Sequence, residues 1–141
     1  MNQPFFTFNI SGSERFAIRA DQIMSIIPYP EVSNSNMFIY RGQVVPVLDV
    51  ENILNILPVT KQPKYMLVLR LDGSAQYYGF GITNPDHVID IDVSEIQPVF
   101  LSSTSPCVLG ALFINNELVT ALCEQTIIQM SADPSDDVEL F

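Results

Sequence analysis

Short apolar runs separated by turn-forming residues extend through most of the chain. Residues 6–10 alternate between apolar and polar side chains, and a Ser-Gly-Ser turn leads into a second apolar run at 16–18. Alternation with a period of two is typical of a β-strand with one buried face. Further short apolar or β-branched runs lie between Gly, Pro, Asn and Asp residues, and together they predict strands at 6–10, 16–18, 23–27, 37–40, 44–48, 65–71, 77–82, 88–91, 109–114 and 118–122.

Local signals predict turns and short helices between these strands. Asp49 precedes apolar residues at helical spacing, so it is expected to cap a short helix that ends at Pro58. A second helical turn is predicted around Ile127. The Asn115-Asn116 pair predicts a tight hairpin turn, because asparagine tolerates the left-handed backbone conformation.

The two halves of the chain repeat part of their pattern: the segments 16–18 and 43–49 recur as 80–82 and 117–123. A half-chain of this size is marginal for an independent core, so we expect two small barrels that divide near residues 58–64 and share an apolar seam. Residues 1–130 then form a single domain, and the acidic tail 131–141 is expected to be a mobile, solvated end. The predicted cores contain Val44, Val47, Leu48, Ile53 and Leu54 in one barrel and Leu118, Leu122, Ile127 and Ile128 in the other.

Composition narrows the function classes. Six Lys and Arg residues against sixteen Asp and Glu residues give a net charge of −10, which disfavours nucleic-acid backbones and anionic membranes as partners. The chain is 48% hydrophobic and 16% charged, which is typical of a globular protein rather than a disordered one. No apolar run is long enough to span a bilayer, and the amino-terminal residues do not resemble a signal peptide. We therefore expect a cytoplasmic protein without direct membrane insertion.

Few residues offer catalytic chemistry. The single histidine, His87, lies in a predicted strand entry, where a surface or packed role is expected. Cys107 and Cys123 lack the spacing of a zinc site, and Cys123 alternates with apolar residues as a core side chain does. Asp90 and Asp92 share one strand face without a third ligand nearby, which favours a solvated face over a metal site. We expect no enzyme activity, no cofactor and no metal.

The segment from Tyr40 to Asp49 carries a recognisable motif. Its sequence, YRGQVVPVLD, resembles the Arg-Gly-x-(Val/Ile)-(Val/Ile)-Pro-Val signature of CheW-like chemotaxis coupling proteins, and the resemblance extends from Phe5 to about Met130. It implies an all-β fold with short helices, in which two SH3-like five-stranded β-barrels pack around a shared hydrophobic core. It also implies an adaptor that couples the cytoplasmic tip of a chemoreceptor to a CheA-type histidine kinase.

The motif residues also have local physical roles. Gly42 permits positive φ in a tight turn, Pro46 marks a strand edge or bulge, and Asp49 caps a helix. Arg41 is open to two interpretations: a rim ion pair of little energetic value, or a contact with the receptor and kinase. The family resemblance favours the contact, so Arg41 and Gly42 are candidate partner-binding residues.

The strand at 23–27 is a second candidate binding element. Adjacent strand residues point to opposite faces, so its apolar side chains either line a groove or are buried between two barrels. The family usually has an acidic residue where this chain has Ser25, and the 28–37 loop is shorter than usual, with Asn36 in a common glycine position. The candidate partner-binding residues of this strand are Ile23, Met24, Ser25, Ile26 and Ile27.

Other functions compete with a receptor–kinase adaptor. The departures from the family pattern fit a CheW-like scaffold of a pilus-type (twitching) or other chemosensory array with altered docking. A small-molecule-binding β-barrel would require an interior cavity with convergent polar groups. An OB-like nucleic-acid binder would require Lys or Arg residues beside exposed aromatic side chains, and the net charge of −10 argues against it.

Overall fold

The computed structural model describes residues 2–10, 14–50, 62–71, 73–97 and 108–129, and most of them lie in strands. Each strand predicted from the apolar pattern is present, although β1 and β8 begin at Asn2 and Asn84, earlier than the pattern indicated. The strands are β1 (Asn2–Asn9), β2 (Arg15–Arg19), β3 (Ile23–Pro28), β4 (Met37–Tyr40), β5 (Gln43–Pro46), β6 (Tyr65–Leu69), β7 (Tyr78–Ile82), β8 (Asn84–Asp92), β9 (Val108–Ile114) and β10 (Glu117–Leu122).

Helical structure is limited to short segments. Two 3₁₀ turns, η1 (Ala20–Gln22) and η2 (Val93–Glu95), follow β2 and β8, and residues 124–129 form the predicted helical turn after β10. The helix predicted after Asp49 lies almost entirely in residues 51–61, outside the described residues. Among the residues that the structure describes, no helix has the length and apolar character needed to cross a membrane.

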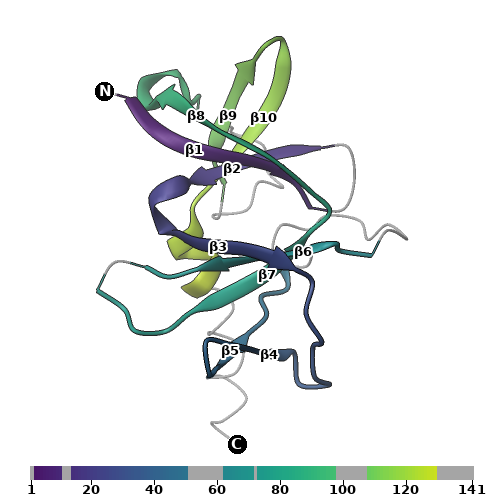
Figure 1. Cartoon of the computed structure of the whole chain (residues 1–141). Coiled ribbons are helices and arrows are strands. Elements are labelled where there is room, and N and C mark those ends of the chain that lie inside the picture. The colour runs from purple at the N-terminus through teal and green to yellow at the C-terminus, as the bar shows by residue number, and fades with distance from the viewer. Residues whose placement is uncertain (1, 11–13, 51–61, 72, 98–107, 130–141) are drawn as a thin grey trace, which may run out of the picture.

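The strands form two units that have the same order. The upper unit in Figure 1 is a five-stranded sheet, β8-β1-β2-β10-β9, in which β10 runs parallel to β2. The lower unit contains the sheet β3-β6-β7 and the hairpin β4–β5, and a parallel bridge from Val47 to Gly79 joins the end of the hairpin to β7. The lower order is therefore β3-β6-β7-β5-β4, so β1–β5 correspond to β6–β10.

Each unit combines strands from early and late parts of the chain. The upper sheet joins β1 and β2 to β8, β9 and β10, and the lower unit joins β3, β4 and β5 to β6 and β7. Extended pairings such as that of β1 with β8 connect residues far apart in sequence. The boundary expected near residues 58–64 lies mainly in residues 51–61, outside the described part of the chain, and stays a prediction.

The largest apolar cluster lies between the two units, as expected for a shared core. It contains Phe6, Phe8 and Phe16 from the upper sheet together with Leu67 and Phe80 from the lower one. The ring centroids of Phe8 and Phe80 lie 5.8 Å apart, so aromatic contacts cross directly between the units. Neither sheet forms a closed barrel among the described residues, and the SH3-like detail stays a prediction.

The predicted division of the core into two residue sets is wrong. Leu48, Leu122, Ile127 and Ile128 all lie in the shared cluster, because both β5 and β10 lead into segments that cover the same interior. Val44 and Leu118 are 60% and 56% exposed, respectively. Val44 lies opposite Ile39, and Leu118 lies opposite Phe113. All four side chains are exposed and lie near a hairpin turn. Val47 is partly buried against a different cluster, and Ile53 and Leu54 lie outside the described residues.

Two smaller apolar clusters occupy the opposite faces of the sheets. The upper one includes Phe5, Ala17 and Val119, and the lower one includes Phe38, Tyr40 and Tyr77. Alternating side chains of β1 explain the separation, since Phe5 contributes to the upper cluster while Phe6 and Phe8 contribute to the shared core. Each unit is thus filled by its own side chains.

Candidate partner-binding surface

Arg41 and Gly42 form the two-residue turn that joins β4 to β5. Their φ angles are 50° and 77°, and both residues are exposed. Positive φ at both central positions defines a type I′ turn, whose twist matches that of the flanking strands. The predicted left-handed conformation of Gly42 is confirmed, but Arg41 adopts it too, in a region that side-chain-bearing residues other than Asn and Asp rarely occupy.

The Arg41 guanidinium stacks on an aromatic pair. Its Cζ atom lies 5.2 Å from the centroid of the Tyr40 ring, and Tyr40 packs edge-to-face on Tyr77 with a centroid separation of 5.2 Å. On the other ring, the Cζ atom of Arg70 lies 5.7 Å from the Tyr77 centroid. Both tyrosines are buried, so the two cations rest on one aromatic unit anchored in the lower cluster.

The candidate residues of β3 occupy different environments. Ile23 packs against the shared core, while Met24 and Ile27 pack against the lower cluster. Ile26 is 36% exposed, and the Ser25 hydroxyl forms a 2.7 Å hydrogen bond with the Tyr40 hydroxyl. The structure therefore brings Ser25 to the same tyrosine as Arg41, whereas the apolar residues of β3 mostly contribute to packing.

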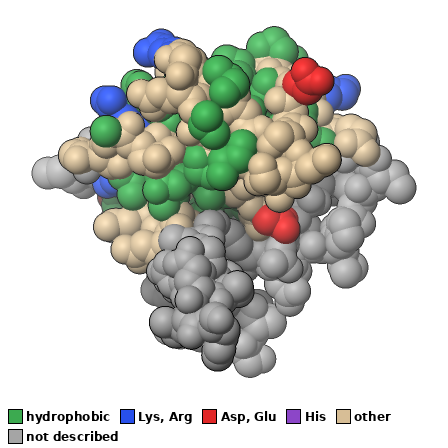
Figure 2. Space-filling model, turned by 90° about the horizontal axis from the view of Figure 1, so that it is seen from below, with side chains coloured by type: hydrophobic (Ala, Val, Ile, Leu, Met, Phe, Trp, Pro, Cys, Tyr) green, Lys and Arg blue, Asp and Glu red, His purple; other side chains and the backbone are tan. Residues whose placement is uncertain are grey.

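An apolar groove lies beside the β4–β5 hairpin. Its volume is about 570 Å³, and its exposed apolar residues include Met37, Ile39 and Val44. Figure 2, which views the molecule from below, shows apolar side chains gathered in the middle of the described surface, basic groups near its edges and few acidic groups. A face that is apolar at its centre and charged near its edges is suited to contact with another protein.

The equivalent hairpin β9–β10 also exposes apolar side chains. Phe113 is 73% exposed and lies directly opposite Leu118, and Leu109 is 45% exposed on the same strand face. In Figure 1 this hairpin extends from the upper unit, at the end of the molecule away from β4–β5. Isolated exposed apolar residues are common, but a directly opposed pair makes a continuous apolar surface.

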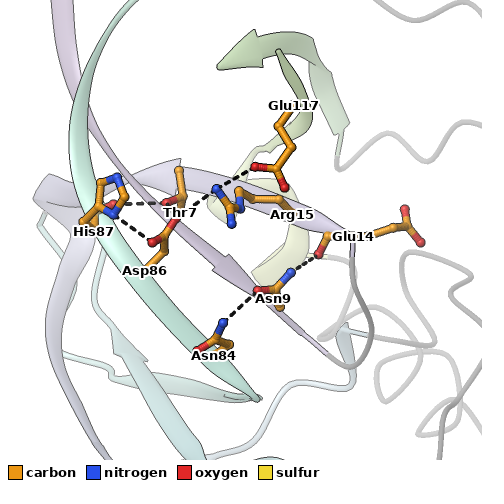
Figure 3. Close-up of polar contacts among 8 residues, drawn as sticks. All are labelled: Thr7, Asn9, Glu14, Arg15, Asn84, Asp86, His87 and Glu117. Carbon is orange, nitrogen blue, oxygen red and sulfur yellow. Dashed lines mark hydrogen bonds and ion pairs between the residues drawn. The ribbon is translucent and has the colours of Figure 1, made fainter. Parts of the chain in front are cut away.

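A polar network links side chains from four neighbouring strands of the upper sheet (Figure 3). Arg15 pairs with Asp86 at 3.2 Å and with Glu117 at 3.1 Å, and Thr7 donates a 2.8 Å hydrogen bond to Asp86. His87 has the first of the two expected roles, a surface residue, and its Nδ1 lies 2.7 Å from the Asp86 carboxylate. The network joins β1, β2, β8 and β10. Among the described residues, no group of three His, Cys, Asp or Glu side chains is arranged to hold a metal.

The cations of the described chain fall into two groups. Arg15 and Arg19 make ion pairs, the latter with the buried Glu124 at 3.1 Å. Arg41, Arg70 and Lys64 make no ion pair with any described carboxylate. No local pattern in the sequence marks Arg70 or Tyr77 as site residues, because only the folded chain brings the end of β6 and the start of β7 to the β4–β5 turn.

A second pocket, of about 220 Å³, lies between β7 and the segment that follows β5, and its lining residues include Leu48, Asp49 and Phe80. Its volume is below the range of about 300–1,000 Å³ that is usual for small-molecule sites. Partial burial raises the pKa of Tyr29, which also lines this pocket. Tyr40 and Tyr77, for their part, lack the exposed faces on which nucleic-acid bases would stack, since both are buried.

Comparisons with known proteins concern nearly the whole chain. A family model described as CheW-like domain matches residues 4–131. The crystal structure of scaffolding protein TtCheW from Thermoanaerobacter tengcongensis is similar to this structure, with a TM-score of 0.69 and 17% sequence identity over 86% of this chain and 84% of that chain. No curated protein matches the chain. At this identity, the structural likeness shows a shared fold.

Proposed function

Because this chain belongs to the CheW-like domain family, we propose that it is a non-enzymatic scaffold of chemotaxis-type signal transduction that couples chemoreceptors to a CheA-type histidine kinase in the cytoplasm. A similar fold in a protein described as a scaffold supports this general role. The equal strand orders of the two units and the cluster filling each of them support two SH3-like barrels around the shared core.

The observation that carries the proposal is the conformation of Arg41. An exposed arginine with φ of 50° occupies the first position of a turn where asparagine or glycine is favoured. Holding such a residue in the left-handed region costs about 1–2 kcal/mol, and backbone strain of this kind clusters at functional sites. The neighbouring groove, whose lining is mostly apolar, supplies contact area beside this arginine.

Arg41→Ala tests the proposal directly. We expect the variant to change the free energy of unfolding by less than about 1 kcal/mol, because an exposed cation–π contact is worth no more than this. The same change is expected to weaken binding of the receptor tip or the kinase by 2 kcal/mol or more, about thirtyfold, if Arg41 is an interface anchor. Denaturant titration and calorimetric binding to each purified partner measure the two effects.

Arg41→Lys refines this test. Lysine keeps the charge but cannot reproduce a planar, bidentate contact, so binding is expected to weaken while the fold persists. A variant that unfolds readily, yet binds normally per folded molecule, would make Arg41 a structural clamp and would contradict the proposed role. Binding of a pilus-type array kinase in place of a chemotaxis kinase would instead favour the alternative array with altered docking.

A further inference from the structure

Arg70 has surroundings similar to those of Arg41, the residue on which the proposed function depends. Each arginine stacks on one member of the Tyr40–Tyr77 pair, and neither makes an ion pair with a described carboxylate. The two cations are therefore connected through two buried rings that touch edge-to-face. This arrangement positions Arg41 and Arg70 relative to each other although they follow different strands, β4 and β6.

A stacked guanidinium is held in place without losing its hydrogen-bonding capacity. The ring takes up one face of the guanidinium plane, while the N–H groups at the edge stay available to an acceptor. Because the tyrosines are fixed by the lower cluster, less side-chain entropy remains to be lost when a partner binds. The Tyr40 hydroxyl is itself held by Ser25 at 2.7 Å, which fixes the ring from the side of β3.

The charge distribution indicates the chemistry of the partner. The chain has a net charge of −10, yet two of its six basic residues lie here without described acidic partners. Screening confines charge effects to about 8 Å at physiological salt, so a local pair of arginines can attract acidic groups although the molecule as a whole repels them. Guanidinium groups bind carboxylates through paired, planar hydrogen bonds.

Building on the proposed function, we infer that Arg41 and Arg70 form a two-arginine site that binds carboxylate side chains of an acidic segment in the protein partner. The apolar groove beside β4–β5 receives the apolar face of the same segment. Nucleic acid is the less favoured occupant, since the two aromatic faces carry arginines and the rings are buried. Arg70 thereby becomes a second specificity-determining residue of the surface.

The test compares three single charge removals in the full chain: Arg41→Gln, Arg70→Gln and the control Lys64→Gln. Lys64 is exposed and makes no described ion pair, so its variant changes the net charge equally without touching the aromatic pair. Binding is measured by titration calorimetry against the receptor tip and the kinase encoded by the same genome. Circular dichroism checks that each variant keeps the β-sheet spectrum of the wild type.

We expect Arg41→Gln and Arg70→Gln to weaken binding of the same partner, with a loss of about tenfold for Arg70→Gln. Lys64→Gln is expected to change this binding less than about twofold. Arg70→Lys is expected to fall between wild type and Arg70→Gln, because it keeps the charge but not the planar fork. Changing the acidic residues of the bound segment to Gln or Asn in the partner should abolish the difference between wild type and Arg70→Gln.

The possible failures are distinguishable. If Arg70→Gln binds like Lys64→Gln while Arg41→Gln loses affinity, the two-arginine site is wrong and the proposed function stands. If the wild-type chain binds neither the kinase nor the receptor tip, the proposed function falls and the inference falls with it. Displacement of the partner by a single-stranded oligonucleotide, lost in the double variant Arg41→Gln/Arg70→Gln, would assign the site to nucleic acid and overturn the inference.

Discussion

The hairpins β4–β5 and β9–β10 occupy equivalent places in the two units, yet their turns differ. The β9–β10 turn uses Asn115 and Asn116, with φ angles of 51° and 65°, and asparagine tolerates this conformation well. The β4–β5 turn has nearly the same backbone but places Arg41 where asparagine would be less strained. The β9–β10 turn thus has residues that favour its backbone conformation. The β4–β5 turn has an exposed arginine at a strained position, which lowers its stability.

The two hairpins also differ in their attachment to the rest of the molecule. β10 pairs with β2 over several residues, and β9 is tied to residue Gln97 by two 2.9 Å backbone hydrogen bonds with Ala111. The β4–β5 hairpin joins β7 through the Val47–Gly79 bridge and a 2.6 Å hydrogen bond from Leu48 to Gly79. The upper hairpin is therefore joined to its sheet by extended backbone pairing, whereas the lower one has fewer backbone pairings and is held by its buried side chains Phe38, Tyr40 and Val45.

The largest expected effect tests the attachment of the upper hairpin. A Cβ atom at Gly110 would collide with the backbone carbonyl of Gln97, which cannot rotate away as a side chain can. Gly110→Ala is expected to lower the free energy of unfolding by about 3 kcal/mol, at the upper end of the cost of overpacking. Urea denaturation measures it. A loss below 1 kcal/mol would show that the backbone at Gln97 shifts freely and that β9 is not anchored there.

A smaller effect is expected at the lower turn. Gly42 has a φ of 77°, and an added Cβ atom would meet no atom within 4 Å, so only backbone strain opposes a substitution. Gly42→Ala is expected to cost about 1–2 kcal/mol of unfolding free energy. The same urea series, run beside Gly110→Ala, checks the ranking. Equal losses at the two glycines would remove the proposed difference in anchoring.

The strain at Arg41 can be isolated with two variants. Arg41→Asn and Arg41→Ala both lose the stacking on Tyr40, but only asparagine is favoured at a φ of 50°. Arg41→Asn is expected to be more stable than Arg41→Ala by about 0.5–1 kcal/mol, while both bind the partner equally weakly. Thermal unfolding together with partner titration separates the two effects. Normal binding by Arg41→Asn would contradict the role of the guanidinium.

The smallest effect concerns a cap at the end of β8. The Asp92 carboxylate accepts hydrogen bonds from the Ser94 hydroxyl at 2.8 Å and the Ser94 amide at 3.1 Å, and these bonds lower the pKa of Asp92. The stability that they confer is present above the pKa of Asp in the unfolded chain and is lost as the pH falls through the lowered pKa of Asp92.

Ser94→Ala removes the hydroxyl donor, so the pKa of Asp92 is expected to rise toward its ordinary value. NMR titration of the Asp92 carboxyl carbon in wild type and variant measures this change. The amide donor remains, so the variant is expected to retain part of the shift. An unchanged titration midpoint would show that the hydrogen bond from the Ser94 hydroxyl does not form in solution. For comparison, no side chain forms a capping hydrogen bond at the N-cap of η1.

The sequence by itself determined the strands and the turns, because both depend on local chemistry. Short apolar runs between turn residues located the strands, and the residue types at Gly42 and Asn115 indicated two turns with positive φ, although not the positive φ of Arg41. The YRGQVVPVLD motif determined the family, which the match over residues 4–131 confirms. It could not show which partner Arg41 contacts, and that role stays a proposal.

Only the tertiary structure decided which strands meet and which apolar side chains are buried. Val44 and Leu118 look like core residues in sequence, yet each faces outward because hairpin register, not hydrophobicity, determines the face on which a side chain lies. Strands from the early and late parts of the chain pair within each unit, and Leu48 and Leu122 therefore lie in one core. The same long-range pairing brings Arg70 and Tyr77 to Tyr40 and Arg41, a juxtaposition that no local pattern encodes.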